Sequence, residues 1–311
     1  VKDGLSQGSV YAIFKDEDGY MWFGTNDGLN RFNGYDYTVL KSDDRDEKTI
    51  PSGIIGSIVE DKEGYLWIGT SSGLGRLDRK SLSVERIDAD INDSKKLSNA
   101  HVWDLYIDSK DNLWVGTESG LNLYDYKTKE FKKFLPSNTD KNTLSDDFIT
   151  SISEGENDEI WIGTKDGLNI LNRNTGKVTR IPRSILPSNY IIKLYKDSDE
   201  NMWIATQDGG VVKFNLKTKK IDKLESINKR YGSENFAVNS MYEGSNKNMW
   251  LGSKGGLIKY SLDTGKIESF NNNPYDSESL VNDSVQSVYR DDEGLIWIGT
   301  YSGISILDTN Q

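Results

Sequence analysis

The chain has 311 residues, of which 38 are basic and 49 are acidic, giving a formal net charge of −11. This acidic balance argues against a nucleic-acid partner, because binding to a phosphate backbone depends on clustered lysine and arginine. No apolar run approaches the ~18 residues that cross a bilayer, and the absence of cysteine excludes disulfides and thiol chemistry.

One stretch of sequence recurs seven times, and each copy contains a tryptophan. These tryptophans are Trp22, Trp67, Trp114, Trp161, Trp203, Trp250 and Trp297. Subtracting neighbouring residue numbers gives spacings of 45, 47, 47, 42, 47 and 47, and only Trp103 lies outside the series. Such a fixed period indicates one supersecondary unit copied along the whole chain.

The first copy shows the elements of the unit in order. Residues 10–14 form a short apolar run at strand length, and the polar residues 16–19 end in a glycine suited to a tight turn. The second strand carries the tryptophan, and Asp27-Gly28 turns the chain into a third strand. A fourth strand is clear in later copies, for example at residues 131–134. Nothing in the period is typical of a helix.

Four antiparallel strands in about 40 to 50 residues are typical of a propeller blade. We therefore predict an all-β fold, a seven-bladed β-propeller with four strands per blade, as a single domain over residues 1–311. The recurrent tryptophans are expected to pack between neighbouring blades. The blades are predicted to begin near residues 10, 55, 102, 149, 191, 238 and 285.

The last blade is predicted to be incomplete. Its third strand falls at residues 304–307, and the sequence stops at Gln311 before a fourth. In a closed ring the N-terminal segment often supplies that strand, because an open ring leaves a sheet edge unpaired. Here Val1 and Lys2 could form at most a stub of it, so we expect the parent chain to continue before Val1.

The candidate binding site rests on residues at the start of the innermost strands. These residues point toward the face of the ring that carries the long loops, and in the third to fifth blades they are aromatic or imidazole side chains. An aromatic floor with polar groups suits a sugar ring, although these aromatics could instead fill the neck of the channel. The candidate ligand-binding residues are His101, Trp103, Asp104, Asp147, Phe148, Asn189, Tyr190, Lys193 and Phe236.

A catalytic or metal centre is not indicated. His101 is the only histidine, so sites built from histidine and cysteine cannot be assembled, and no nucleophile elbow or phosphate loop occurs. The aspartate-rich tight turns of the repeat are interpreted as residues that stabilise the turn. Weak calcium coordination is the alternative, but these turns lack the later glutamate of a calcium-binding loop. We predict no catalytic residues, no metal ligands and no cofactor, while a paired-carboxylate glycosidase stays open.

The pattern Asp-x-x-Gly-x-Leu-Trp-Ile-Gly-Thr-x-x-Gly-Leu, present at residues 61–74 and nearly repeated at 291–304, resembles the regulator propeller repeats of bacterial two-component sensors. Weaker copies replace the turn glycine, at Asp158-Glu159 and Lys247-Asn248. The resemblance implies an extracellular or periplasmic sensor region of a histidine kinase or diguanylate cyclase, often associated with glycan use. It implies contact with the membrane only through other parts of the parent chain.

Three functional hypotheses follow. The first is a ligand-sensing or interaction propeller of a signalling receptor, with an oligosaccharide or another small polar ligand as its partner. The second is a propeller enzyme, a lyase or glycoside hydrolase, because a fold does not settle function. The third is a structural scaffold that positions or dimerises neighbouring domains, in which case the chain forms a homodimer.

Overall fold

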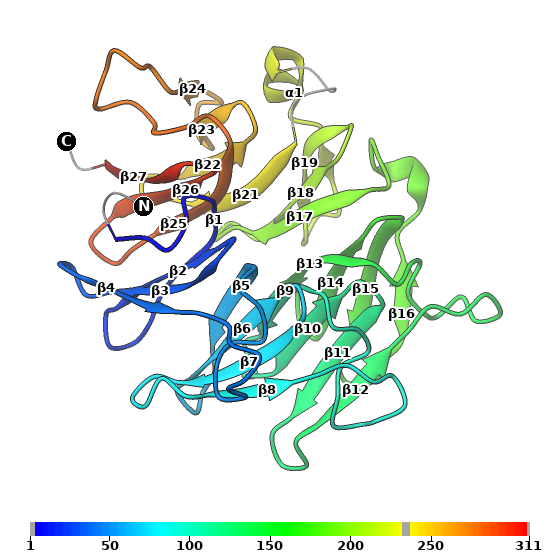
Figure 1. Cartoon of the computed structure of the whole chain (residues 1–311). Helices are drawn as coiled ribbons and strands as arrows, with labels where there is room; N and C mark the ends of the chain where they lie inside the picture. The colour runs from blue at the N-terminus through cyan, green and yellow to red at the C-terminus, as the bar shows by residue number, and fades with distance from the viewer. Residues whose placement is uncertain (1–3, 232–236, 310–311) are drawn as a thin grey trace.

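A ring of seven antiparallel sheets makes up the computed structural model, which describes residues 4–231 and 237–309 (Figure 1). Among the described residues, six sheets have four strands and the seventh has three. The seven-bladed propeller with an incomplete last blade, predicted from the repeat, is therefore confirmed. Two predictions fall outside the described residues: the binding role of Phe236 and the strand stub at Val1 and Lys2.

The strands run outward from the axis in chain order within each blade. The first three blades contain β1 (Val10–Lys15), β2 (Met21–Thr25), β3 (Gly28–Phe32), β4 (Tyr37–Leu40), β5 (Ile55–Glu60), β6 (Tyr65–Thr70), β7 (Gly73–Asp78), β8 (Val84–Ile87), β9 (Val102–Ile107), β10 (Leu113–Thr117), β11 (Gly120–Asp125) and β12 (Glu130–Phe134). The next two contain β13 (Ile149–Glu154), β14 (Glu159–Thr164), β15 (Gly167–Asn172), β16 (Val178–Arg180), β17 (Ile191–Lys196), β18 (Asn201–Thr206), β19 (Gly210–Asn215) and β20 (Ile221–Asp222). The last two contain β21 (Val238–Glu243), β22 (Asn248–Ser253), β23 (Gly256–Ser261), β24 (Ile267–Phe270), β25 (Val285–Arg290), β26 (Leu295–Thr300) and β27 (Gly303–Asp308).

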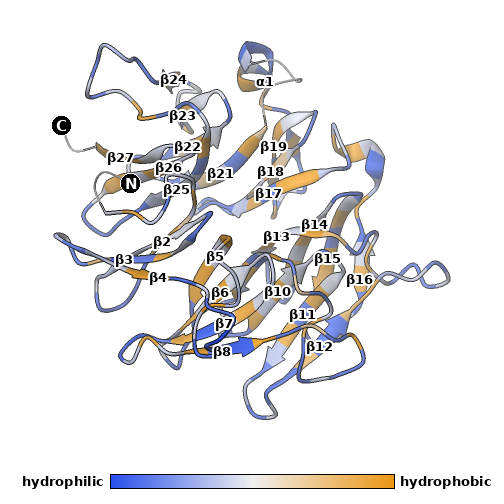
Figure 2. Cartoon of the chain, viewed as in Figure 1, coloured by the Kyte–Doolittle hydropathy of each residue, from blue (hydrophilic) through white to orange (hydrophobic). Residues whose placement is uncertain are grey.

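The core lies between the blades. Every residue of β2, β10 and β18 is buried, because both faces of a blade sheet pack on neighbours. Trp67 of the second blade, for example, packs with Val102 and Leu105 of the third. Figure 2 shows the same division, with hydrophobic residues along the strands and hydrophilic ones in the loops between them.

The long loops hold buried anchors that their polar composition conceals. Each anchor is an aliphatic side chain a few residues before an innermost strand, and it packs between two blades. The anchors are Leu5, Ile50, Leu97, Leu144 and Leu280. Next to two of them, the backbone N–H groups of Ser98 and Ser145 donate to Asn122 and Asn169 of the third strands, each at 2.9 Å. The loops are thereby fixed to the ring.

The expectation that the repeat contains no helix needs one correction. The segment after β20 forms α1 (Glu225–Tyr231), and a 3-10 turn, η1 (Arg183–Ile185), follows β16. The helix forms because Ile227 is fully buried against the blade while Glu225 and Lys229 pair one turn apart at 2.8 Å. No helix within residues 4–231 and 237–309 is long and apolar enough to cross a bilayer.

Candidate functional site

Two side-chain positions of each blade meet on the loop face of the ring. One position immediately precedes the innermost strand, and the other follows the last residue of the second strand. In the third to fifth blades the backbone N–H of the second position donates to the carbonyl of the first. These pairs are Glu118 to His101 at 3.1 Å, Lys165 to Phe148 at 3.2 Å and Gln207 to Tyr190 at 2.9 Å.

Trp103 is the centre of an aromatic cluster at the third blade. Its ring stacks on His101 with centroids 4.9 Å apart and planes 10° apart, and it contacts Phe148 of the fourth blade at 5.3 Å. Glu118 accepts from the Trp103 indole N–H at 3.3 Å and lies 3.1 Å from His101 Nδ1. Despite these contacts Trp103 is 44% exposed, so its outer face is available to a ligand.

A lysine joins this cluster to the fifth blade. The Lys165 ammonium lies 3.5 Å from the centre of the Phe148 ring and 5.9 Å from that of Tyr190. A cation over an aromatic face is held by the ring quadrupole, which fixes the lysine above these rings. Partial burial raises the pKa of Tyr190, so its phenol stays protonated and able to donate a hydrogen bond.

A pocket of about 200 Å³ lies beside these aromatics. Its lining combines aromatic and aliphatic surface with amide, hydroxyl and ammonium groups. The lining residues are Trp103, Phe148, Thr150, Tyr190, Ile192, Gln207, Ala237, Asn239 and Lys254. Apolar walls with a few convergent polar groups are the usual form of a small-molecule site. The structure therefore brings Trp103, Phe148 and Tyr190 together, with His101 stacked behind Trp103.

The other candidate residues lie elsewhere. Asp104 is buried, accepts from the Ile152 backbone N–H at 2.8 Å, and lies 3.7 Å from the Lys193 ammonium. Burial raises the pKa of Asp104, while Lys193 and the hydrogen bonds oppose that shift. Asp147 and Asn189 each use a backbone carbonyl to hold the first glycine of the preceding blade's third strand, at 2.7 and 2.8 Å.

Sequence reasoning missed six of the nine residues that line the pocket. Thr150, Ile192 and Asn239 occupy the second position of their innermost strands, the position that Trp103 holds in the third blade. Gln207 and Lys254 directly follow a second strand. The sequence could have revealed these residues, because their positions vary from copy to copy within an otherwise repeated motif. Such variation is expected of side chains that face a ligand and not a core.

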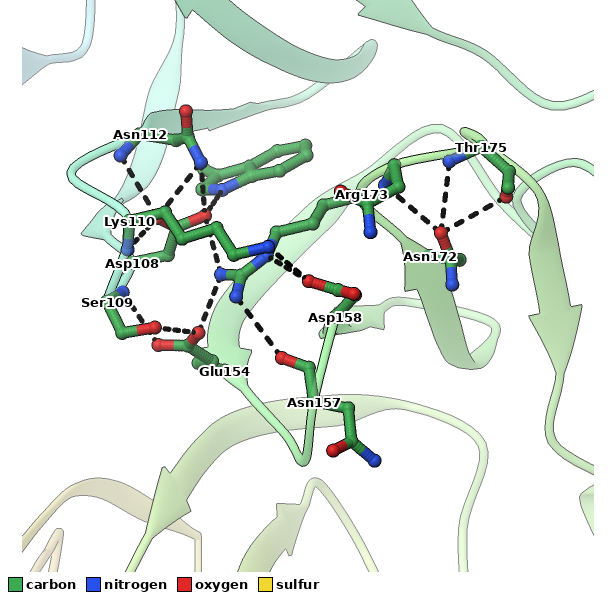
Figure 3. Close-up of polar contacts among 12 residues, drawn as sticks. Asp108, Ser109, Lys110, Asn112, Glu154, Asn157, Asp158, Asn172, Arg173 and Thr175 are labelled. Carbon is green, nitrogen blue, oxygen red and sulfur yellow. Dashed lines mark hydrogen bonds and ion pairs between the residues drawn. The ribbon is translucent and has the colours of Figure 1, made fainter.

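A dense polar cluster lies between the third and fourth blades, away from the pocket (Figure 3). Arg173, of which only 5% of the side chain is exposed, lies 3.2 Å from Asp108, 2.6 Å from Glu154 and 3.2 Å from Asp158. Lys110 also pairs with Asp158, at 2.5 Å. Each charged group in this cluster already has a partner of opposite charge within the protein. The cluster therefore acts as a structural link between the two blades, which we call the clasp.

Metal ligation finds no support in the described part of the chain. Within residues 4–231 and 237–309, no three or more histidine or acidic side chains are grouped so that they could hold an ion. His101 has its ring stacked on Trp103 and its Nδ1 beside Glu118, so it belongs to the aromatic cluster.

Comparison with known proteins places the repeat in a described family. The profile of the two-component regulator propeller matches residues 4–27, 49–72, 96–119, 143–166, 185–208 and 279–302. A segment of 48 residues is 44% identical to the histidine kinase P4 of Formosa agariphila. That segment is 15% of this chain and 4% of the kinase.

Solved structures share the fold over nearly the whole chain. The extracellular domain of a B. thetaiotaomicron protein assigned as the hybrid two-component system BT3049 superposes with a TM-score of 0.83 and 24% identity, over 98% of this chain and 40% of that one. The extracellular domain of BT4673, assigned as a one-component system from the same organism, gives 0.81 and 25%, over 97% and 38%. Streptogramin B lyase gives 0.73 and 14%, over 98% and 96%. The chain thus spans about two fifths of the two sensor-system domains.

Proposed function

Because the chain belongs to the two-component regulator propeller family, we propose that it is an extracytoplasmic ligand-sensing propeller of a bacterial membrane signalling receptor. The family repeats and the likeness to extracellular domains of two-component systems support this proposal. Since the chain spans only part of those domains, the signalling output belongs to the whole receptor. An extracellular or periplasmic location is part of the same proposal.

The pocket beside Trp103 is the observation that carries the binding role. We infer that its ligand is an oligosaccharide or a similar polar molecule with one apolar face. The exposed ring of Trp103 offers a surface for the C–H face of a sugar, as aromatic side chains commonly do. Gln207, Asn239 and Lys254 offer donors and acceptors to hydroxyl groups at the edge of such a ring.

An enzymatic role has weaker support. The likeness to streptogramin B lyase, at 14% identity, concerns the fold alone. The single histidine is engaged by Trp103 and Glu118, and no nucleophile lies beside it among the described contacts. A binding site with no assembled acid, base and nucleophile is consistent with sensing.

Tryptophan fluorescence gives a direct test. Trp103 is 44% exposed, whereas the other seven tryptophans are at most 8% exposed, so a ligand at this pocket changes the emission of Trp103 selectively. Oligosaccharides are screened by thermal shift, and each hit is titrated against wild type and Trp103→Phe. The proposal expects a fluorescence change that the variant loses.

Matched substitutions separate this pocket from the rest of the rim. Tyr190→Ala is expected to weaken binding, whereas Tyr301→Ala, which removes an exposed aromatic from the seventh blade, leaves it unchanged. Equal affinity of both variants would place the ligand elsewhere. Self-association without any ligand response would favour a scaffold, and turnover of a glycan would favour an enzyme.

A further inference from the structure

The pocket beside Trp103 differs in charge from other hollows of the ring. Its lining contains one charged side chain, Lys254, and no carboxylate. Four other hollows formed by the described residues each include at least one carboxylate, for example that of Asp222, Asp276, Glu154 or Glu225. The chain as a whole has 49 acidic and 38 basic residues. This pocket is therefore a cationic hollow in an acidic protein.

The cation comes from the rim position that directly follows a second strand. From the first blade to the seventh, this position is held by Asn26, Ser71, Glu118, Lys165, Gln207, Lys254 and Tyr301. Lysine occupies it only in the fourth and sixth blades, on both sides of Gln207. The innermost strands of the fourth to sixth blades supply Thr150, Ile192 and Asn239 to the pocket wall. The two lysines and the pocket thus share one sector of the rim.

Lys165 is held at the edge of the pocket by two of the rings that line it. Its ammonium lies 3.5 Å from the centre of the Phe148 ring and 5.9 Å from that of Tyr190. An ammonium group has three N–H donors, and an aromatic face engages it from one side only. Lys165 therefore keeps donors for a ligand while its position beside the pocket is fixed.

Neither rim lysine is neutralised by a carboxylate of the described chain. Lys193, on the innermost strand of the fifth blade, lies 3.7 Å from Asp104, whereas Lys165 and Lys254 form no ion pair within residues 4–231 and 237–309. Glu118, the acidic residue among these rim positions, already accepts from an indole N–H at 3.3 Å and lies 3.1 Å from an imidazole nitrogen. Two like charges without counter-ions create a positive potential that attracts anions.

We propose that the ligand of this pocket is an acidic oligosaccharide, whose anionic group is bound by Lys165 and Lys254 while a sugar ring packs on Trp103. This inference rests on the proposed sensing function and adds the charge of the ligand to it. The carboxylate of a uronic acid and a sulfate ester share the required chemistry, because both accept charge-assisted hydrogen bonds from an ammonium group. Gln207, between the two lysines, offers an amide donor to the same anion.

Matched pairs of oligosaccharides test this proposal on the protein as it stands. The acidic probes are trisaccharides of galacturonate and of mannuronate and a sulfated galactose tetrasaccharide. Each is compared with a neutral counterpart, made by reducing its carboxylates to alcohols or by removing its sulfates, so the pairs distinguish the two kinds of anion. Trp103 fluorescence at up to millimolar ligand measures binding. We expect at least one acidic probe to bind about tenfold more tightly than its counterpart, and this preference to decline as salt is added.

The outcomes separate this proposal from the sensing function on which it rests. A neutral probe that binds as tightly as its acidic counterpart would overturn the charge preference and leave the sensing function standing. No response of Trp103 to any acidic probe would also overturn the charge preference. The neutral oligosaccharides would then decide the sensing function, which fails only if none of them binds either.

Variants of the protein check that the rim lysines carry the preference. Lys254→Gln removes a charge but keeps a hydrogen-bonding group, so it should weaken the best acidic probe about fivefold and leave its neutral counterpart unchanged. Lys165→Gln should act in the same way, and Lys254→Arg should restore binding. The control is Lys177→Gln, at an exposed position between β15 and β16, which changes the net charge equally. Equal affinity of Lys254→Gln and Lys177→Gln for the acidic probe would overturn the proposal.

Discussion

The indole N–H of Trp67 donates to Asp61 Oδ2 across 2.7 Å inside the second blade. The other oxygen of the same carboxylate accepts from the backbone N–H groups of Glu63 and Tyr65 at 2.9 and 3.0 Å. One side chain therefore closes the tight turn and satisfies the polar atom of a fully buried tryptophan. The same bond joins Asp16 to Trp22, Asp108 to Trp114, Asp197 to Trp203 and Asp291 to Trp297.

Removing this carboxylate should destabilise the ring. Asp61→Ala leaves a buried indole N–H and two turn N–H groups without their acceptor, and we expect a loss of about 2 to 4 kcal/mol in the free energy of unfolding. Asp61→Asn retains one acceptor oxygen and should cost less. Urea denaturation measures both, with Asp44→Ala at an exposed site as the control. A wild-type midpoint for Asp61→Ala would show that the bond contributes nothing.

Acid should release part of this stabilisation at Asp108. Burial opposes ionisation there, but hydrogen bonds from Trp114, Asn112 and the Lys110 backbone lower its pKa overall. A folded pKa below the unfolded value of about 4 contributes stability that is complete above pH ~4 and is lost as the pH falls through the folded pKa. Denaturation of wild type and Asp108→Asn between pH 7 and pH 2 should show a shallower acid loss in the variant. Parallel curves would contradict this assignment.

The clasp between the third and fourth blades predicts a large effect of one arginine. Arg173→Met leaves three carboxylates without their shared cation, and the Asp108 side chain is fully buried, so we expect about 3 to 5 kcal/mol of destabilisation. Arg183→Met is the matched control. Its pair with Asp166 is exposed and should change stability by less than about 1 kcal/mol. Equal midpoints for the two variants in urea would rule out a structural role for the clasp.

Truncation of two tryptophans should destabilise the protein to very different extents. Trp161 is 1% exposed and packs against the fifth blade, so Trp161→Ala should cost about 3 to 5 kcal/mol. Trp103 is 44% exposed, so Trp103→Ala should cost about 1 kcal/mol or less while removing the main wall of the pocket. Thermal unfolding measures the difference. A melting temperature for Trp161→Ala equal to that of wild type would show that it is not a core residue.

The fold was predictable because the repeat fixes both strand type and number. Seven tryptophans at a nearly constant spacing, each followed by a turn glycine, leave few arrangements other than a ring of blades. The anchors Leu97 and Leu144 were not predicted, since each is one aliphatic residue among polar neighbours and its burial depends on two blades meeting. The same reason conceals α1, in which Ile227 is the single buried side chain.

The site was predictable only on one side. His101, Phe148 and Tyr190 could be placed because each directly precedes an innermost strand. Their rim partners Glu118 and Lys165 could not, because the pairing joins the two ends of a hairpin and becomes visible only when the strand register is known. For Asp104 the sequence predicted a carboxylate that is available to a ligand. In the structure this carboxylate instead accepts a hydrogen bond from the Ile152 backbone of the next blade.

The hydrogen bond between the two rim positions of a blade, such as that from Lys165 N to Phe148 O, uses backbone atoms alone. Replacing either side chain therefore leaves the scaffold that presents it intact. Within each repeat, the side chains at the two rim positions determine which ligand can bind, whereas the backbone hydrogen bond between these positions holds the structure together. The rim side chains can therefore change while the backbone arrangement is retained. A propeller of this kind can acquire a new ligand specificity through a few substitutions at the rim, because each substituted protein still folds.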